Sequence, residues 1–137
     1  MPRPKGSTNA EVLRIVQAIE AGDRQSLVIL IVPSHTRWKM EIAAQDIWAD
    51  AALDLFAELY GGATAFNTYA GIYRNKDSQE HLKDRPILIE SYVDKNRVRD
   101  VRSLTQLVDF MKRMGRETEQ LAVAVVIDNT FHEITDY

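Results

Sequence analysis

The chain has 137 residues, of which 45% are hydrophobic and 27% charged, with no cysteine and a formal net charge of −3. This composition is typical of one globular domain. The lack of cysteine excludes thiol nucleophiles, disulfide frameworks, iron–sulfur clusters and thiolate zinc sites. A mildly acidic protein is not a general polyanion binder, so contact with nucleic acid requires a local basic cluster.

Neither a membrane span nor a signal peptide is predicted. The longest apolar run, Leu27 to Pro33, is far shorter than the roughly 20 residues that cross a bilayer. The first residues turn polar without an apolar stretch of the signal-peptide kind. We therefore expect a cytoplasmic protein with no membrane partner.

Residues 1–8 hold two prolines, a glycine and two cations, which predicts a disordered basic arm ahead of a single α+β domain at 9–137. The core of this arm, Pro2 to Ser7, resembles an AT-hook, in which an extended Arg-Pro segment lies in the DNA minor groove. That resemblance implies DNA contacts from Arg3 and Lys5. A solubilising tail is the alternative.

Helices and strands then alternate along the chain. Thr8 and Glu11 have capping-box spacing and open an amphipathic helix over 9–22. The patterns that follow predict a strand from Ser26 to Val32, a helix from about Ala43 to Tyr60, and a strand from Ala63 to Tyr73 that is kinked near Gly71. A turn over 75–78, a strand from Pro86 to Val93 and a charged loop come next. The last predicted elements are a helix that opens at the capping box Ser103–Gln106 and ends at Gly115, and strands from Leu121 to Ile127 and Thr130 to Ile134.

The β-α-β-β-α-β order predicts a ferredoxin-like α+β sheet, with an extra N-terminal helix and a C-terminal strand. In this fold the first and third strands are central and both helices cover one face. The strands at 27–32 and 121–127 are apolar without alternation, which is typical of strands covered on both sides. We therefore expect the N-terminal helix, a second subunit or both to cover the other face, and predict a homodimer or higher oligomer.

Charges are sorted along the chain. Residues 41–58 hold five acidic and no basic residues, and like charges four apart in a helix repel one another. The region 95–116 carries an excess of basic residues. One interpretation is that these surfaces pair or face water. The other is a protein-docking ridge formed by Asp46, Asp50, Asp54 and Glu58, and a phosphate or nucleic-acid contact formed by Lys95, Arg97, Arg99 and Arg102.

Support for catalysis is limited to isolated residues. His35 follows the first strand and could act as acid or base, with Arg37 or Arg116 as an anion anchor. Glu90 could be its partner if that strand faces a cleft. No spacing links these residues or matches a metal or phosphate-loop motif, so we expect no metal and no cofactor. Trp38 lies on a polar loop and is the best aromatic candidate for a contact residue.

The layout from Leu27 onward resembles an uncharacterised group of small bacterial ferredoxin-like proteins. The resemblance implies the βαββαβ fold and no particular activity. If the positions that carry this resemblance form one site, the ends of the second predicted helix, the third predicted helix and the first predicted strand must converge. The positions that carry it are Pro33-Ser34-His35, Trp48, Leu59 to Ala65, Gly71, Met114 to Thr118 and Gln120.

These features favour a non-catalytic, oligomeric binding or regulatory module. Its predicted partner is nucleic acid or a phosphorylated small ligand, bound by the basic segment 95–102 and the arm. A small enzyme with a site between subunits that uses His35 is one alternative. A factor that docks a cationic protein on the acidic ridge is the other.

Overall fold

The computed structural model describes residues 9–20, 25–74 and 78–137. The predicted basic arm, and most of the predicted turn over 75–78, lie outside these ranges. The elements are α1 (Asn9–Glu20), β1 (Gln25–Val32), α2 (Gln45–Tyr60), β2 (Thr64–Asn67), β3 (Gly71–Arg74), β4 (His81–Asp84), β5 (Ile87–Asp94), α3 (Lys95–Val98), α4 (Val101–Glu117), β6 (Val123–Ile127) and β7 (Thr130–Ile134).

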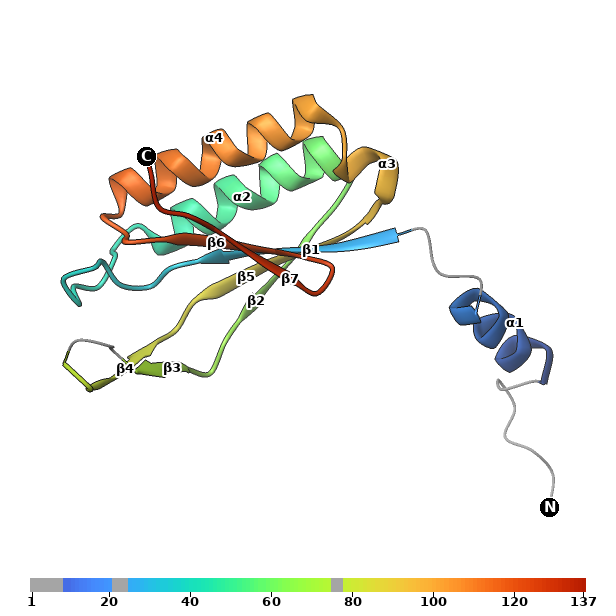
Figure 1. Cartoon of the computed structure of the whole chain (residues 1–137), viewed down its shortest axis with the longest axis horizontal. Coiled ribbons are helices and arrows are strands. Elements are labelled where there is room, and N and C mark those ends of the chain that lie inside the picture. Colours follow the sequence, from blue (N-terminus) through green and yellow to red (C-terminus); the bar gives the residue numbers. More distant parts are fainter. Residues whose placement is uncertain (1–8, 21–24, 75–77) are drawn as a thin grey trace, which may run out of the picture.

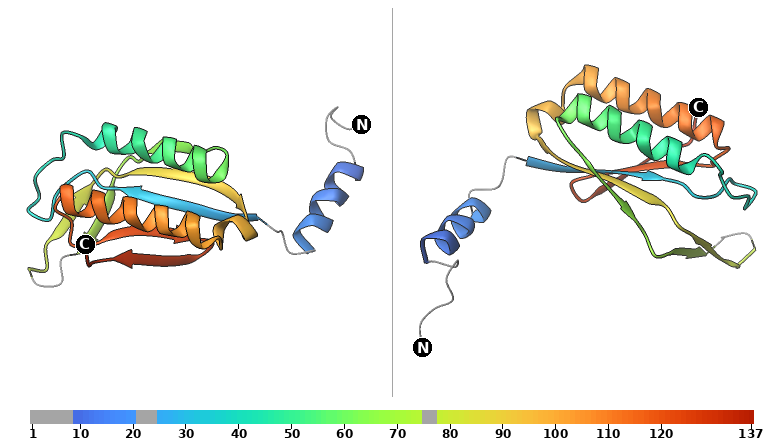
Figure 2. Two further views of the ribbon diagram at one scale, coloured as in Figure 1. Left: turned by 90° about the horizontal axis from the view of Figure 1, so that it is seen from above. Right: turned by 180° about the vertical axis from the view of Figure 1, so that it is seen from behind.

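Five strands form one antiparallel sheet in the order β2-β5-β1-β6-β7. The first and third strands of the repeat, β1 and β5, lie inside the sheet as predicted. Helices α2 and α4 run side by side across the same face, which Figures 1 and 2 show from three directions. This arrangement confirms the predicted α+β fold. The opposite face, which we call the open face, has neither of these helices on it.

The core lies between the two helices and the face of the sheet that they cover. Burial alternates along β1, so that Val28, Leu30 and Val32 face the helices with at most 1% of their surface exposed. Strand β5 alternates in the same way, with Ile89 fully buried beside Leu30. From the helices, the residues that close this core include Ala52, Phe56, Leu107, Met111 and Met114.

Local signals explain where the helices begin and end. Helix α2 ends where Gly61 takes a left-handed φ of 90° and donates its N–H to the Ala57 carbonyl. Helix α4 begins two residues before the predicted capping box, because the carboxylate of Asp100 accepts the N–H of Ser103 at 3.0 Å. In the same way Asp94 caps a short helix, α3, in the segment that we predicted as a charged loop.

The predicted strand from Ala63 to Tyr73 is divided into β2 and β3. The break lies at residues 68–70, where the Thr68 hydroxyl donates to the Pro86 carbonyl at 2.7 Å and holds the two sides of the bend together. Strand β4, which the sequence patterns did not predict, pairs only with β3 in a second, two-stranded sheet. Together β3 and β4 form an arm that extends beyond the main sheet (Figure 1).

Helix α1 has no buried residue, although one of its sides is apolar. The exposed fractions of Val12, Ile15, Val16 and Ile19 range from 40% to 71%. Figure 1 shows α1 away from the sheet, so within one chain this helix does not cover the open face. A cover from a second subunit, with or without its N-terminal helix, stays a prediction.

Candidate functional site

The strand register decides which side chains share the open face. Directly paired residues lie on the same face, and Glu90 pairs with both Thr64 on β2 and Ile29 on β1. Ile29 in turn pairs with Val126 on β6, which pairs with Phe131 on β7. One row of side chains therefore crosses all five strands, with a single carboxylate near its middle.

The rows on either side of Glu90 are mainly apolar. Leu88 lies between Phe66 and Ile31, and Tyr92 pairs with Leu27. The three aromatic rings of this face are markedly exposed, at 46% for Phe66, 65% for Tyr92 and 55% for Phe131. An apolar area that covers much of one face of a sheet is rarely left in water, and it indicates a site of contact.

Glu90 is half-buried among these apolar side chains. Within the described residues no ion pair or hydrogen bond joins its carboxylate to another group. Burying an unpaired carboxylate costs several kcal/mol, and a cation nearby offsets that cost. A partner that covers the open face therefore has to place a positive charge beside the Glu90 carboxylate or leave that carboxylate hydrated.

A second polar cluster lies where β1 ends. The hydroxyl of Ser34 is hydrogen-bonded to Nδ1 of His35 at 2.7 Å and accepts the N–H of Arg85 at 2.8 Å. Burial raises the pKa of Asp84 above its usual 3.8, and the nearby charge of His35 offsets part of this rise. Ionisation of Asp84 therefore lowers stability as the pH rises above that value.

The loop after β1 is tied to the end of α4. Arg37 donates its backbone N–H to the Glu119 carbonyl at 2.8 Å, and Nε1 of Trp38 donates to the Glu119 carboxylate at 3.0 Å. Gln120 donates to the carbonyl of His35 at 2.8 Å. The guanidinium of Arg37 lies 5.1 Å from the centre of the Trp38 ring, which leaves this tryptophan fixed but 66% exposed.

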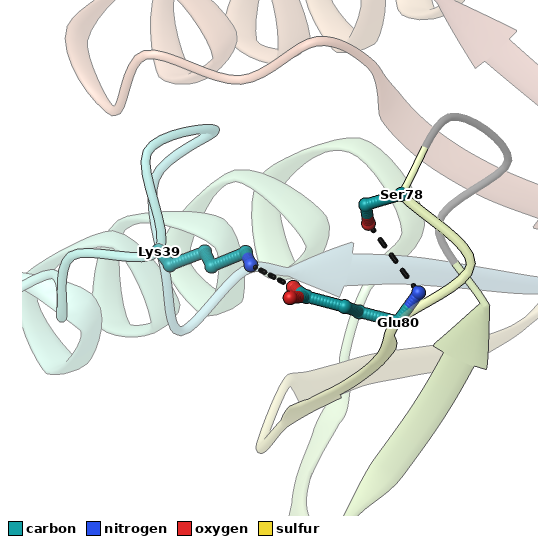
Figure 3. Close-up of polar contacts among 3 residues, drawn as sticks. All are labelled: Lys39, Ser78 and Glu80. Carbon is teal, nitrogen blue, oxygen red and sulfur yellow. Dashed lines mark hydrogen bonds and ion pairs between the residues drawn. The ribbon is translucent and has the colours of Figure 1, made fainter.

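The same loop contacts the β3–β4 arm. Nζ of Lys39 lies 2.7 Å from the carboxylate of Glu80, whose own N–H is donated to the Ser78 hydroxyl at 3.3 Å (Figure 3). This hydrogen bond from Lys39 lowers the pKa of Glu80. Both side chains are exposed, so the pair orients the arm more than it stabilises the fold.

These contacts bring together only part of the predicted catalytic group. The ends of β1 and α4 converge through His35 and Gln120, but the end of α2 lies at the opposite end of β1, where Ser91 donates to the Gly62 carbonyl at 2.6 Å. Arg116 is exposed on the last turn of α4, and no described contact links it to His35 or Arg37. An inter-subunit site around His35 stays a prediction.

The predicted phosphate-binding residues are divided in space. Arg97 and Arg102 line an open groove of about 690 Å³ between the end of α2 and the start of α4. Three carboxylates, from Glu58, Asp94 and Asp100, line the same groove, so its charge is mixed instead of basic. Lys95 and Arg99 are outside its lining, and Arg3 and Lys5 lie outside the described residues.

The acidic ridge is exposed along α2, as its spacing predicted. In the described ranges the ion pairs are Lys39–Glu80 and Arg113–Glu117, so none joins the ridge to the basic segment. Asp46 and Asp50 line a smaller groove beside β2, whereas Glu58 lines the mixed-charge groove. The same part of the chain has no group of three or more acidic or histidine side chains arranged to hold a metal ion.

No described helix is both long enough and apolar enough to span a bilayer. No family model and no curated protein matches this chain. Among solved structures it is similar to a phage SAM lyase in complex with S-methyl-5′-thioadenosine, with 16% identity and a TM-score of 0.57 over 84% of this chain and 92% of the other. A phage SAM lyase in the apo state matches at 12% identity and a TM-score of 0.47, over 82% and 88%.

At this level of identity the likeness is one of fold. The name of the neighbour describes a lyase, which is an enzyme. Sequence patterns had pointed to Glu90 only as a partner for a histidine, and they did not point to Thr64 or Asp84. The available signal was a lone carboxylate directly after the apolar run from Ile87 to Ile89.

Proposed function

We propose that the protein is a small oligomeric enzyme that binds an adenosyl sulfonium, such as S-adenosylmethionine, on the open face of its sheet, with a second copy completing the site. The observation that carries this proposal is Glu90, an unpaired carboxylate within an apolar face, in the part of the chain that the structure describes. The shared fold with a phage SAM lyase supports it by analogy.

A sulfonium ligand fits the chemistry of this face. It carries a permanent positive charge that can offset the cost of covering the carboxylate of Glu90. Its adenine ring can stack on an exposed aromatic side chain, and Phe66, Tyr92 and Phe131 supply three. Thr64, directly opposite Glu90, adds a hydroxyl that can donate or accept a hydrogen bond.

The reaction would be cleavage of a carbon–sulfur bond to give S-methyl-5′-thioadenosine. When the bond between sulfur and the methionine-derived chain breaks, its electron pair stays on sulfur and the positive charge of sulfur disappears. The carbon that loses sulfur forms its new bond to a carboxylate oxygen of the same chain, which closes a five-membered ring, so the second product is homoserine lactone. Removing water favours a step in which charge is lost. In this proposal Glu90 binds and orients the cation, and it interacts more strongly with the charged substrate than with the neutral product.

Calorimetric titration of S-adenosylmethionine and S-methyl-5′-thioadenosine tests this role. Glu90→Gln removes the charge at constant size and is expected to weaken binding of the sulfonium about tenfold or more. Binding of the neutral thioether is expected to stay within about twofold, because a neutral ligand lacks the charge that Glu90 recognises.

Glu133→Gln is the matched control, since Glu133 lies on the same face but on the edge strand β7, opposite Ala124. It is expected to leave both affinities unchanged. Mass spectrometry of the wild-type mixture then checks for release of S-methyl-5′-thioadenosine. Absence of sulfonium binding to the wild-type protein, or equal weakening of both ligands by Glu90→Gln, would contradict the proposal.

The contact with phosphate or nucleic acid stays a prediction with less support. Three carboxylates share the groove of Arg97 and Arg102, and they oppose a polyanion at that position. The test measures retention of the protein on immobilised DNA after the charges of Arg97 and Arg102 are removed. If retention persists in these variants, the N-terminal arm remains as the contact. Retention lost in these variants would favour the groove.

A further inference from the structure

A groove of about 310 Å³ runs between α2 and the edge strand β2. Its floor is apolar, with Ile87 and Ala49 almost fully buried and Leu53 half-buried. Its walls are the carboxylates of Asp46 and Asp50 on one side and the residues Ala65 and Asn67 on the other. We call it the β2 groove.

Strand β2 is the outer strand of the sheet on this side. It pairs with β5 along one edge, and its other edge makes no backbone hydrogen bond to any segment in the described ranges. All four of its residues, Thr64 to Asn67, are exposed. Edge strands are commonly protected by lysine, proline or a covering loop, and β2 has none of these among its residues and described neighbours.

The charge of the β2 groove is of one sign. No basic residue lines it, and within the described residues neither Asp46 nor Asp50 belongs to an ion pair. The two carboxylates are four residues apart on α2, which puts them on the same side of the helix and unfavourably close to each other. A cationic group between them would relieve that repulsion.

We propose that the β2 groove binds an extended segment of a partner protein that carries lysine or arginine at alternate positions. The segment adds as a further strand on the free edge of β2, where its backbone pairs with the unpaired N–H and C=O groups. Because side chains alternate across a strand, every second residue faces the same side as Ala65 and Asn67, toward Asp46 and Asp50. This inference does not depend on the ligand of the open face.

A fluorescently labelled peptide, Lys-Thr-Lys-Val-Lys-Thr-Lys, is a suitable probe for anisotropy measurements with the full chain at about 150 mM salt, where the screening length is about 8 Å. Asp50→Asn is expected to weaken its binding about two- to fivefold, the range for one exposed charge pair. Asp54→Asn is the matched control: it is exposed on the same ridge but outside the groove, and a change below about 1.5-fold is expected.

Two further measurements test the strand pairing itself. A peptide of the same sequence with N-methylated backbone amides keeps every charge but cannot donate along an edge, so its binding is expected to fall by about tenfold or more. Amide hydrogen exchange of residues 64–67 is expected to slow when the unmodified peptide is bound.

Several outcomes would overturn the proposal. The first is no binding of the unmodified peptide to the wild-type chain. Equal binding of the N-methylated peptide would mean that charge alone holds the probe on the surface. Equal weakening by Asp50→Asn and Asp54→Asn would locate the contact on the ridge as a whole instead of in the β2 groove. Each of these results leaves the assay of sulfonium binding at Glu90 unaffected.

Discussion

The two faces of the five-stranded sheet are built from neighbouring residues of the same strands, and they have different surroundings. On the covered face, Ser91 is buried and donates a hydrogen bond to the Gly62 carbonyl. On the open face, the adjacent Glu90 has no partner in the described ranges. Pairing is not complete in the core either, where the Tyr60 hydroxyl is buried without a described partner. What distinguishes Glu90 is its charge and its place among exposed apolar side chains, where a covering molecule would have to compensate the carboxylate.

The largest expected effect contrasts apolar side chains on the two faces. Leu30→Ala should lower the free energy of unfolding by about 2–5 kcal/mol, because Leu30 is fully buried beneath the helices. Ile29→Ala, on the open face, should cost less in the isolated chain and more when a second copy is bound. Urea denaturation at two protein concentrations measures both. Equal losses of unfolding free energy in the two variants, unchanged by protein concentration, would contradict the expected difference between the two faces.

A charge on the open face should weaken the proposed self-association of the chain. Phe131→Glu is expected to weaken self-association by about tenfold or more, since a buried aromatic contact at an interface contributes about 2 kcal/mol. Ile47→Glu is the control, because Ile47 is 70% exposed on α2, away from the open face. Sedimentation velocity gives the mass of each variant. If the wild-type protein is monomeric at micromolar concentration, the predicted second subunit is wrong.

The smallest effect concerns the two polar neighbours on β5. Ser91→Ala should destabilise the protein by about 0.5–1.5 kcal/mol, because the Gly62 carbonyl loses its donor. Glu90→Leu should leave stability unchanged or raise it, because it replaces an unpaired carboxylate within an apolar face. Thermal unfolding of both variants checks the sign of each change. A loss of stability in Glu90→Leu would show that the carboxylate has a structural role.

Much of the fold follows from local patterns. The apolar runs at 27–32 and 121–127 and the glycines after Tyr60 were sufficient to predict the central strands, the end of α2 and the order of the elements. The bend between β2 and β3 was expected near Gly71, whereas strand β4 was not predicted, because the residues from His81 to Asp84 form no apolar run. Helix α3 was missed because its short run of charged residues has no apolar stripe.

The candidate site was less predictable than the fold. The prediction of a cover on one face of the sheet comes from the lack of alternation between apolar and polar residue types in β1. The position of Glu90 opposite Ile29 and Thr64 depends on strand register. Likewise, sequence spacing could not link His35 to Asp84 and Gln120, which lie 49 and 85 residues away along the chain. Such groups are brought together by topology.

The two tryptophans of the chain give the helical layer and the loop after β1 separate optical signals. Trp48 packs edge-on against Phe110 with the ring centres 5.7 Å apart, so its emission reports the contact between α2 and α4. Trp38 is mostly exposed and is held by Glu119 at the end of β1, so its emission reports the loop and its attachment to α4. Replacing either one by phenylalanine leaves a single tryptophan, and unfolding of the helical layer can then be timed separately from release of the loop.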